Sequence, residues 1–414
     1  MLVDFTGRPA IRIASRDARE IRIANRTVWP VATENVLAAN RTWFATTSTG
    51  FSAVATSRRS HFAHSHGDVS DLVFVDTGRY MSGTGVWTNV SYTIKRFIEY
   101  PIGDFTQVTW DGQPQITVAS GSTVESDALP ITIPKGAQFF ERTVHLGGSI
   151  PRMALPNYPA SLGLPDGNSV GDFGDNGDIS ASSTTMTSFG AIGIRGTVHA
   201  ANARGVLLLG DSIIFGLDDM TGVGAKGGSG YMARAIDPQF AWAKIAVSGQ
   251  QAAEFANLIG FTQLRTIIQA LGVTDAWMAY GLNDLNTASA APETIIASCQ
   301  TIADGLRACG VQRVHQSTIG PSAESTDDWA TVENQTPATS GNLEAIPEVN
   351  ALIRSRPAYL DGTIFDVADI AMSAHDSGVW ATPPKPVFDD RTHPNSYMSG
   401  VIADALSAQV AALK

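Results

Sequence analysis

One serine in the middle of the chain lies where it could act as a nucleophile. Ser212 follows the apolar run 206–209 in the stretch Gly210-Asp-Ser212. Four apolar residues in a row predict a strand buried on both faces, and open α/β sheets bind ligands at the carboxyl ends of such strands. A serine attacks an acyl group only if a base and an oxyanion hole meet it. The alternative is that Asp211 or Ser212 only caps the following helix.

Three further polar blocks occur in the same half of the chain, two of them at the ends of expected strands and the third near the C-terminus. They are Ser248-Gly249, Gly281-Leu-Asn-Asp284 and Asp390-Arg-Thr-His393. A hydroxyl is a weak nucleophile near neutral pH, so a base must remove its proton, and His393 could do this from a C-terminal loop. Taken separately, each block is ordinary, because His393 could end a loop and Asn283 could cap a helix. Together and in this order, the four blocks favour one shared site.

The elements that must position these blocks alternate between strands and helices. We expect strands at 205–210, 240–247, 276–280, 311–318 and 363–367, and helices at 263–271, 292–308, 342–354 and 396–413. Such alternation predicts a mostly parallel sheet covered by helices on both faces. Parallel strands end at the same edge of a sheet, so the blocks that end them are expected to meet there.

Taken together, the four blocks resemble those of the SGNH (GDSL-type) hydrolase family over residues 205–414. The resemblance implies a three-layer α/β/α (flavodoxin-like) domain that cleaves esters through an acyl-serine. It also implies a triad in which Ser212 attacks, His393 is the base, and Asp390 orients the imidazole and stabilises its cation. The neighbouring Asp389 stays open as an alternative to Asp390.

The same resemblance implies an oxyanion hole for the tetrahedral intermediate. Its donors would be the backbone N–H groups of Ser212 and Gly249 and the side-chain amide of Asn283. One such donor typically lowers the barrier by roughly 3–4 kcal/mol. We expect Asp211 and Asp284 to hold turns rather than to take part in the chemistry.

The first 204 residues differ in character from the rest. Residues 1–30 contain two alternating runs that resemble strand-turn-strand modules of phage tail proteins, although a plain N-terminal hairpin explains them equally well. Residues 31–150 carry short β-branched runs and resemble the accessory β-domain of some bacterial and phage GDSL-type esterases, which predicts an all-β sandwich-like domain. Residues 151–204 are rich in Pro, Gly, Asp and Ser, and we expect a linker or a long ordered loop.

Metal and disulfide chemistry are not expected. Three histidines, His61, His64 and His66, are close in sequence, but no further ligand at a suitable spacing joins them, so we interpret them as polar loop histidines. No metal and no cofactor are predicted. Cys299 and Cys309 lie ten residues apart in an expected helix, about 15 Å along its axis, which is too far for a disulfide.

Composition excludes several classes of partner. The net charge of −11 argues against a nucleic-acid partner, and no run of 18 apolar residues predicts insertion into a membrane. The N-terminal residues do not have the pattern of a secretory signal, so we expect a cytoplasmic product, virion-associated or released by lysis if it comes from a phage.

The resemblance to the SGNH family implies a carboxylic ester hydrolase that removes short acyl groups, above all O-acetyl groups, from a carbohydrate such as a bacterial surface polysaccharide. One alternative is a lipid or thioester hydrolase of the same fold. Another is a glycan-binding or receptor-binding protein with a vestigial hydrolase domain. The sugar, the position of the acyl group and the oligomeric state are left open.

Overall fold

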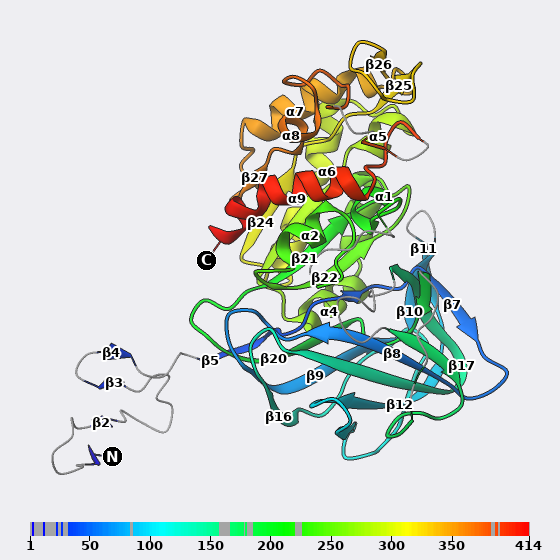
Figure 1. The fold of residues 1–414 in the computed structure, drawn as a ribbon, viewed down its shortest axis with the longest axis vertical. Helices are drawn as coiled ribbons and strands as arrows, with labels where there is room; N and C mark the ends of the chain where they lie inside the picture. Colours follow the sequence, from blue (N-terminus) through cyan, green and yellow to red (C-terminus); the bar gives the residue numbers. More distant parts are fainter. Residues whose placement is uncertain are drawn as a thin grey trace.

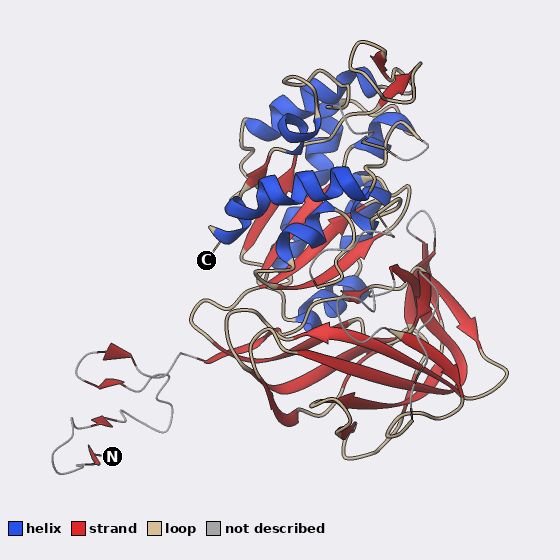
Figure 2. Cartoon of the chain, in the orientation of Figure 1, coloured by secondary structure: helices blue, strands red, loops and turns tan. Residues whose placement is uncertain are grey.

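The computed structural model describes residues 2–3, 11–12, 22–23, 26–27, 32–82, 86–156, 166–177, 179, 185–219, 226–381, 386–387 and 390–413. It is a mixed α/β structure in which a helix-rich C-terminal part lies against a part built from strands (Figure 1). Figure 2 shows how sharply helices and long antiparallel strands are divided between the two parts. None of the described helices is long and apolar enough to cross a membrane.

A six-stranded sheet forms the centre of the C-terminal part, and all its strand pairs are parallel. In order across the sheet, its strands are β27 (Ile364–Phe365), β24 (Arg313–Ser317), β23 (Asp275–Ala279), β21 (Gly205–Gly210), β22 (Ala241–Ala246) and β6 (Thr42–Trp43). Five of the six were expected from the sequence, with ends that differ by up to two residues. Strand β21 lies between β22 and β23, so three of the polar blocks follow adjacent strands.

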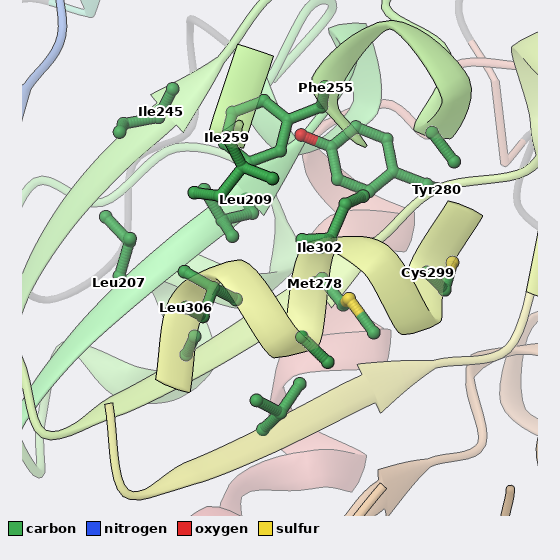
Figure 3. Packing of buried hydrophobic residues seen from close by; sticks show 14 of the residues in the cluster. Leu207, Leu209, Ile245, Phe255, Ile259, Met278, Tyr280, Cys299, Ile302 and Leu306 are labelled. Atoms are coloured by element: carbon green, nitrogen blue, oxygen red, sulfur yellow. The ribbon is translucent and has the colours of Figure 1, made fainter. Parts of the chain in front are cut away.

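Helices cover both faces of this sheet because successive strand residues point to opposite sides. Leu207 and Leu209 of β21 pack in one apolar cluster with helices α3 (Ala252–Ile259), α4 (Thr262–Leu271), α6 (Pro292–Ala308) and α7 (Ile346–Arg354). Figure 3 shows the contribution of α3 and α6 to this cluster. Val206 and Leu208 pack in another with α2 (Tyr231–Ile236), α8 (Val367–Ala371) and α9 (Ser396–Ala411). Cys299 and Cys309 are both free and buried, as expected.

The expected helices are confirmed, with small differences. The segment expected at 342–354 begins with a 3₁₀ turn, η2 (Leu343–Ala345), before α7. Short helices that the sequence did not predict also occur; these are α1 (Ser212–Phe215), α2, α3, α5 (Leu282–Asn286) and α8. Each has eight residues or fewer, which is too short to show a clear helical period.

The N-terminal part contains two antiparallel sheets that share one apolar core. The larger contains β7 (Thr47–Gly50), β8 (Ala55–Phe62), β12 (Tyr92–Glu99), β13 (Phe105–Val108), β14 (Ile116–Val118), β17 (Gln138–Pro156), β18 (Gly167–Val170) and β19 (Thr185–Ser188). The smaller contains β5 (Ala32–Leu37), β9 (Val69–Thr77), β15 (Thr123–Glu125), β16 (Leu129–Ile133) and β20 (Gly193–His199). A small hairpin of β10 (Arg79–Ser82) and β11 (Val86–Asn89) accompanies these sheets, and a second, of β25 (Ala323–Ser325) and β26 (Gln335–Pro337), belongs to the C-terminal part.

Two observations differ from the expected division of the chain. Within 151–204, expected to be a linker or loop, β18, β19 and β20 join the antiparallel sheets, and β20 pairs with both β5 and β9. The alternating burial along β20 explains its place, because every second residue faces the core. Strand β6, in the segment expected to be all-β, instead forms the edge of the parallel sheet.

The predicted hairpin at 1–30 lies largely outside the described residues. The described pieces are the two-residue strands β1 (Leu2–Val3), β2 (Ile11–Arg12), β3 (Arg22–Ile23) and β4 (Arg26–Thr27). They pair antiparallel in this order.

The core of the antiparallel part contains charged groups as well as apolar ones. Glu141 on β17 is fully buried and binds the Arg96 guanidinium at 2.8 Å and the His61 ring at 3.1 Å. Arg96 also donates to both carboxylate oxygens of Asp76, at 2.6 and 2.7 Å. Burial alone would raise the pKa of Glu141, but Arg96 and His61 lower it. A buried carboxylate is tolerated here because its neighbours are cationic or donate hydrogen bonds.

Candidate active site

The structure brings Ser212 and His393 together although 181 residues separate them in the chain. Ser212 is the first residue of α1, directly after β21, and His393 lies in the loop before α9. The Oγ of Ser212 and the Nε2 of His393 are 2.7 Å apart. This is hydrogen-bonding distance, so the imidazole can take the hydroxyl proton as an acyl carbon is attacked.

Asp390 holds the other side of the same imidazole. One of its carboxylate oxygens hydrogen-bonds the Nδ1 of His393, and the other accepts the backbone N–H groups of Thr392 and His393, both at 2.8 Å. The loop is therefore folded around the carboxylate, and Nε2 is directed at Ser212. Asp389, the alternative to Asp390, lies outside the described residues.

Charge at the site favours a protonated imidazole. Burial lowers the pKa of His393, but the hydrogen bond and charge of Asp390, with the charges of Asp218 and Asp211, raise it above its ordinary value of 6.5. Burial also disfavours the Asp390 carboxylate, yet its hydrogen bonds lower its pKa to about 2. The cation that forms on His393 during attack is therefore stabilised by a permanent negative charge.

Two of the predicted oxyanion donors are backbone groups at the ends of adjacent strands. The N–H groups of Ser212 and Gly249 make no hydrogen bond to the described part of the chain. Gly249 has a φ of 81°, a left-handed conformation that glycine adopts without strain, and a Cβ there would meet nothing within 4 Å. Both N–H groups can therefore bind a developing oxyanion.

The third predicted donor, the Asn283 side chain on α5, is held by Asp211. Its Nδ2 donates to Asp211 at 2.9 Å and, more weakly, to the carbonyl of Gln250 at 3.4 Å. An oxyanion could replace the longer contact while the shorter one keeps the amide in place. Asp211 is buried, which raises its pKa to about 6, and it also accepts the N–H of Ile213 as the N-cap of α1.

Asp284 fixes the neighbouring loop rather than facing the predicted nucleophile. Its carboxylate accepts the backbone N–H groups of Ala252 and Ala253, at 2.9 and 3.3 Å, which are the first residues of α3. The Gly249 loop leads directly into this helix. Both aspartates therefore hold turns, as expected, and the turns they hold carry two of the predicted oxyanion donors.

An open cavity, here called the outer cavity, brings all the predicted site residues to one surface. It measures about 380 Å³ and is lined by Ser212, Leu217, Ser248, Gly249, Leu282, Asn283, Asn286, Asp390, Arg391, Thr392 and His393. Small-molecule sites typically measure roughly 300–1,000 Å³. Eight of its eleven lining residues have polar side chains, and Arg391 is held there by Glu324 at 2.6 Å and Ser340 at 2.8 Å.

The sequence reasoning missed several residues of this cavity. Leu217, Asn286 and Arg391 line it, and Asp218 lies within 4.8 Å of ligand atoms of both Asp390 and His393. Arg391 could have been found, since it lies inside the block 390–393. Leu217 and Asp218 follow α1 at the start of a glycine-rich segment, and no local pattern distinguishes them.

The ring nitrogens of two of the three clustered histidines, His61 and His64, are engaged in hydrogen bonds within the protein. His61 binds Glu141 and the carbonyl of Asn40, whereas His64 binds the carbonyl of Arg204 and the N–H of His66. Among the described residues, one group of side chains, Asp218, Asp390 and His393, places three potential ligand atoms within 4.8 Å of one another.

Comparisons with known proteins were made with families, curated proteins and solved structures. No family model matches the chain, and no curated protein matches it significantly. A family 3 carbohydrate esterase from Talaromyces cellulolyticus aligns at 19% identity over 51% of this chain and 97% of its own, with a TM-score of 0.34. A family two carbohydrate esterase from Clostridium thermocellum, in complex with cellohexaose, aligns at 12% identity over 89% and 93%, with a TM-score of 0.36.

A protein from Desulfitobacterium hafniense, described as a lipolytic protein of the G-D-S-L family, aligns at 14% identity over 50% of this chain and 99% of its own, with a TM-score of 0.37. All three TM-scores lie below 0.5.

Proposed function

We propose that this chain is a serine esterase that removes short acyl groups, above all acetyl, from a carbohydrate. The observation that supports this most directly is the hydrogen-bonded series Ser212–His393–Asp390 at the mouth of the outer cavity. In this proposal the C-terminal part is a three-layer SGNH-type catalytic domain, and the antiparallel part is an accessory sandwich-like domain.

The reaction would proceed in two steps. His393 takes the proton of Ser212 as Oγ bonds to the acyl carbon, and the oxyanion is bound by the N–H groups of Ser212 and Gly249 and the amide of Asn283. His393 then protonates the leaving alcohol as its bond to carbon breaks. Water, activated by the same imidazole, releases the acid from the acyl-serine.

The polar rim of the outer cavity supports a carbohydrate as the alcohol part of the substrate. Ser248, Asn286, Arg391 and Thr392 offer hydroxyl, amide and guanidinium groups to a molecule bound there. Sugar hydroxyls are donors and acceptors that such groups recognise, whereas a lipid tail offers them no hydrogen bond. An acetylated bacterial surface polysaccharide is the finer form of the proposal.

The test compares hydrolysis of p-nitrophenyl acetate by the parent and by Ser212→Ala, with and without EDTA. The matched control is Ser407→Ala, an exposed serine on α9. We expect Ser212→Ala to lower kcat by at least about 10⁴-fold and the control to have no effect. EDTA is expected to change nothing. Equal rates in the parent and Ser212→Ala would contradict the proposed nucleophile.

The substrate class is tested by acetate release from acetylated polysaccharides and by hydrolysis of long-chain acyl esters and thioesters. Preferred release from the glycans supports the proposal, whereas preference for long acyl chains would favour a lipid or thioester hydrolase. Tight glycan binding without any hydrolysis, unchanged in Ser212→Ala, would favour a binding protein with a vestigial site.

A further inference from the structure

A second cavity, here called the inner cavity, lies at the same strand ends as the candidate site. Its wall is mainly aliphatic and aromatic, and includes Ile213, Ile214, Ala279, Ile319, Ala371 and Ile402. The cavity measures about 40 Å³. One water-sized atom needs roughly 10–15 Å³ on this measure, so the inner cavity has room for about three such atoms.

The inner cavity is directly adjacent to the residues proposed to act on the ester. Its wall includes Asp211 and Ile213, on either side of Ser212, and Thr392 and Pro394, on either side of His393. The nucleophile and the base therefore lie on the boundary between the inner and outer cavities.

Two residues contribute to both cavities and so form the partition between them. Leu282 and Thr392 line the outer cavity as well as the inner one. Leu282 immediately precedes Asn283, the proposed oxyanion donor. An acyl carbon bonded to Ser212, with its oxyanion on Asn283, would therefore lie next to the partition.

The four substituents of the tetrahedral carbon can each be given a place. One is the Oγ of Ser212, and the oxyanion is bound by the N–H of Gly249 and the amide of Asn283. The leaving alcohol must stay near His393, which protonates it, and it extends into the outer cavity, where Asn286, Arg391 and Thr392 can hydrogen-bond it. The remaining substituent, the acyl chain, is apolar, and the adjoining apolar space is the inner cavity.

We propose that the inner cavity binds the acyl chain of the substrate and restricts it to short aliphatic groups of about two to four carbons. This inference rests on the proposed esterase function and adds to it the acyl specificity. The mainly apolar wall favours a hydrocarbon chain, and the small volume excludes a long one. Leu282 and Thr392 are the residues that such a chain would pass.

Two substitutions change the volume of the inner cavity in opposite directions. Ala371→Leu, on α8, fills part of it, since Ala371 is fully buried in its wall. Ile319→Ala enlarges it next to the site, because the Cδ1 atom of Ile319 lies against Gly281. Matched controls are Ala408→Leu on the exposed face of α9 and Ile102→Ala, whose side chain is exposed.

The measurement is kcat/KM for the p-nitrophenyl esters of acetate, butyrate and hexanoate, with melting temperatures to show that each variant is folded. For the parent, we expect hexanoate to react at least about tenfold more slowly than acetate or butyrate. Ala371→Leu should lower the butyrate to acetate ratio by about tenfold, and Ile319→Ala should raise the hexanoate to acetate ratio by a similar factor. The controls should keep the parent's ratios.

Unchanged ratios in both variants would overturn the acyl-binding role while leaving the esterase function standing, provided that Ser212→Ala abolishes acetate release. If Ala371→Leu does not fold, Ile319→Ala alone decides, because it removes atoms and does not crowd the core. If the parent hydrolyses none of the three esters, the inference fails together with the proposed function.

Discussion

The carboxylate of Asp211 accepts a hydrogen bond at 2.9 Å from the side-chain amide of Asn283, 72 residues further along the chain. Both residues belong to the candidate site, because Asp211 directly precedes the predicted nucleophile Ser212 and Asn283 is a proposed oxyanion donor. The contact therefore joins the turn that carries the nucleophile to the helix that carries the donor.

Asp211→Asn should lower kcat by about ten- to hundredfold with little change in KM. The new side chain can still cap α1 through its oxygen, but its NH₂ group would then face the NH₂ group of Asn283, which turns away. The loss should be smaller than that of Asn283→Ala, since removing an oxyanion donor typically costs about 10²–10³ in kcat. Steady-state kinetics of the two variants and the double variant test this, and fully additive losses would contradict the coupling.

Turnover should rise with pH through the pKa of His393, because only the neutral imidazole accepts the serine proton. Burial lowers this pKa, but Asp390, Asp218 and Asp211 together raise it above 6.5. Asp218→Asn removes one nearby negative charge, so the midpoint of the kcat/KM profile should move to lower pH while the plateau stays the same. Asp404→Asn, exposed on α9, is the control. If the midpoint does not move, the charge of Asp218 does not affect the pKa of the His393 imidazole.

The same groups make stability depend on pH. The pKa of His393 is higher in the folded state, so its stabilising contribution is complete below about 6.5 and is lost as pH rises through the folded-state pKa. The pKa of Asp390 is lowered to about 2, so its contribution to stability is complete above about pH 3.9, the ordinary pKa of an aspartate, and is lost as the pH falls through 2. Denaturant unfolding of the parent and of His393→Ala between pH 5 and 9 should show that their difference shrinks as pH rises.

Asp284→Ala should reduce both stability and activity. It removes the acceptor for two N–H groups at the start of α3, and such a loss typically costs roughly 0.5–2 kcal/mol. The loop that carries Gly249 leads into this helix, so kcat should also fall. Melting temperature and kcat are measured together, with Asp404→Ala as the exposed control. A stability loss with unchanged kcat would show that the Gly249 loop does not depend on this cap.

Glu141→Ala should destabilise the antiparallel part by about 3–5 kcal/mol, because Arg96 would keep a buried charge with one partner fewer. Glu344→Ala, at an exposed position, should change the free energy of unfolding by no more than about 0.5 kcal/mol. Denaturant unfolding followed by circular dichroism measures both. A loss below 1 kcal/mol for Glu141→Ala would show that water or Asp76 compensates Arg96.

Long, periodic elements were the predictable part of the fold. Helix α6 has the expected ends, Pro292 and Ala308, because proline is favoured in the first helical turn and Gly310 follows the last. Strand β21 was predictable from its continuous apolar run. By contrast, β6 has only two residues, and nothing in Thr42–Trp43 indicates that they extend a parallel sheet formed more than 160 residues later.

The sequence by itself determined which polar blocks end the parallel strands, and therefore that Ser212, Gly249 and Asn283 would share one edge of a sheet; His393 was expected beside them from the resemblance that its block completes. That follows from local patterns, since apolar runs and breaker residues are readable without knowing their partners. Only the tertiary structure decided the contact between Asp211 and Asn283, the place of Asp218 beside His393, and the inner cavity. These depend on how loops and short helices pack across distances of many residues, and packing is set by the shapes of all the neighbours at once.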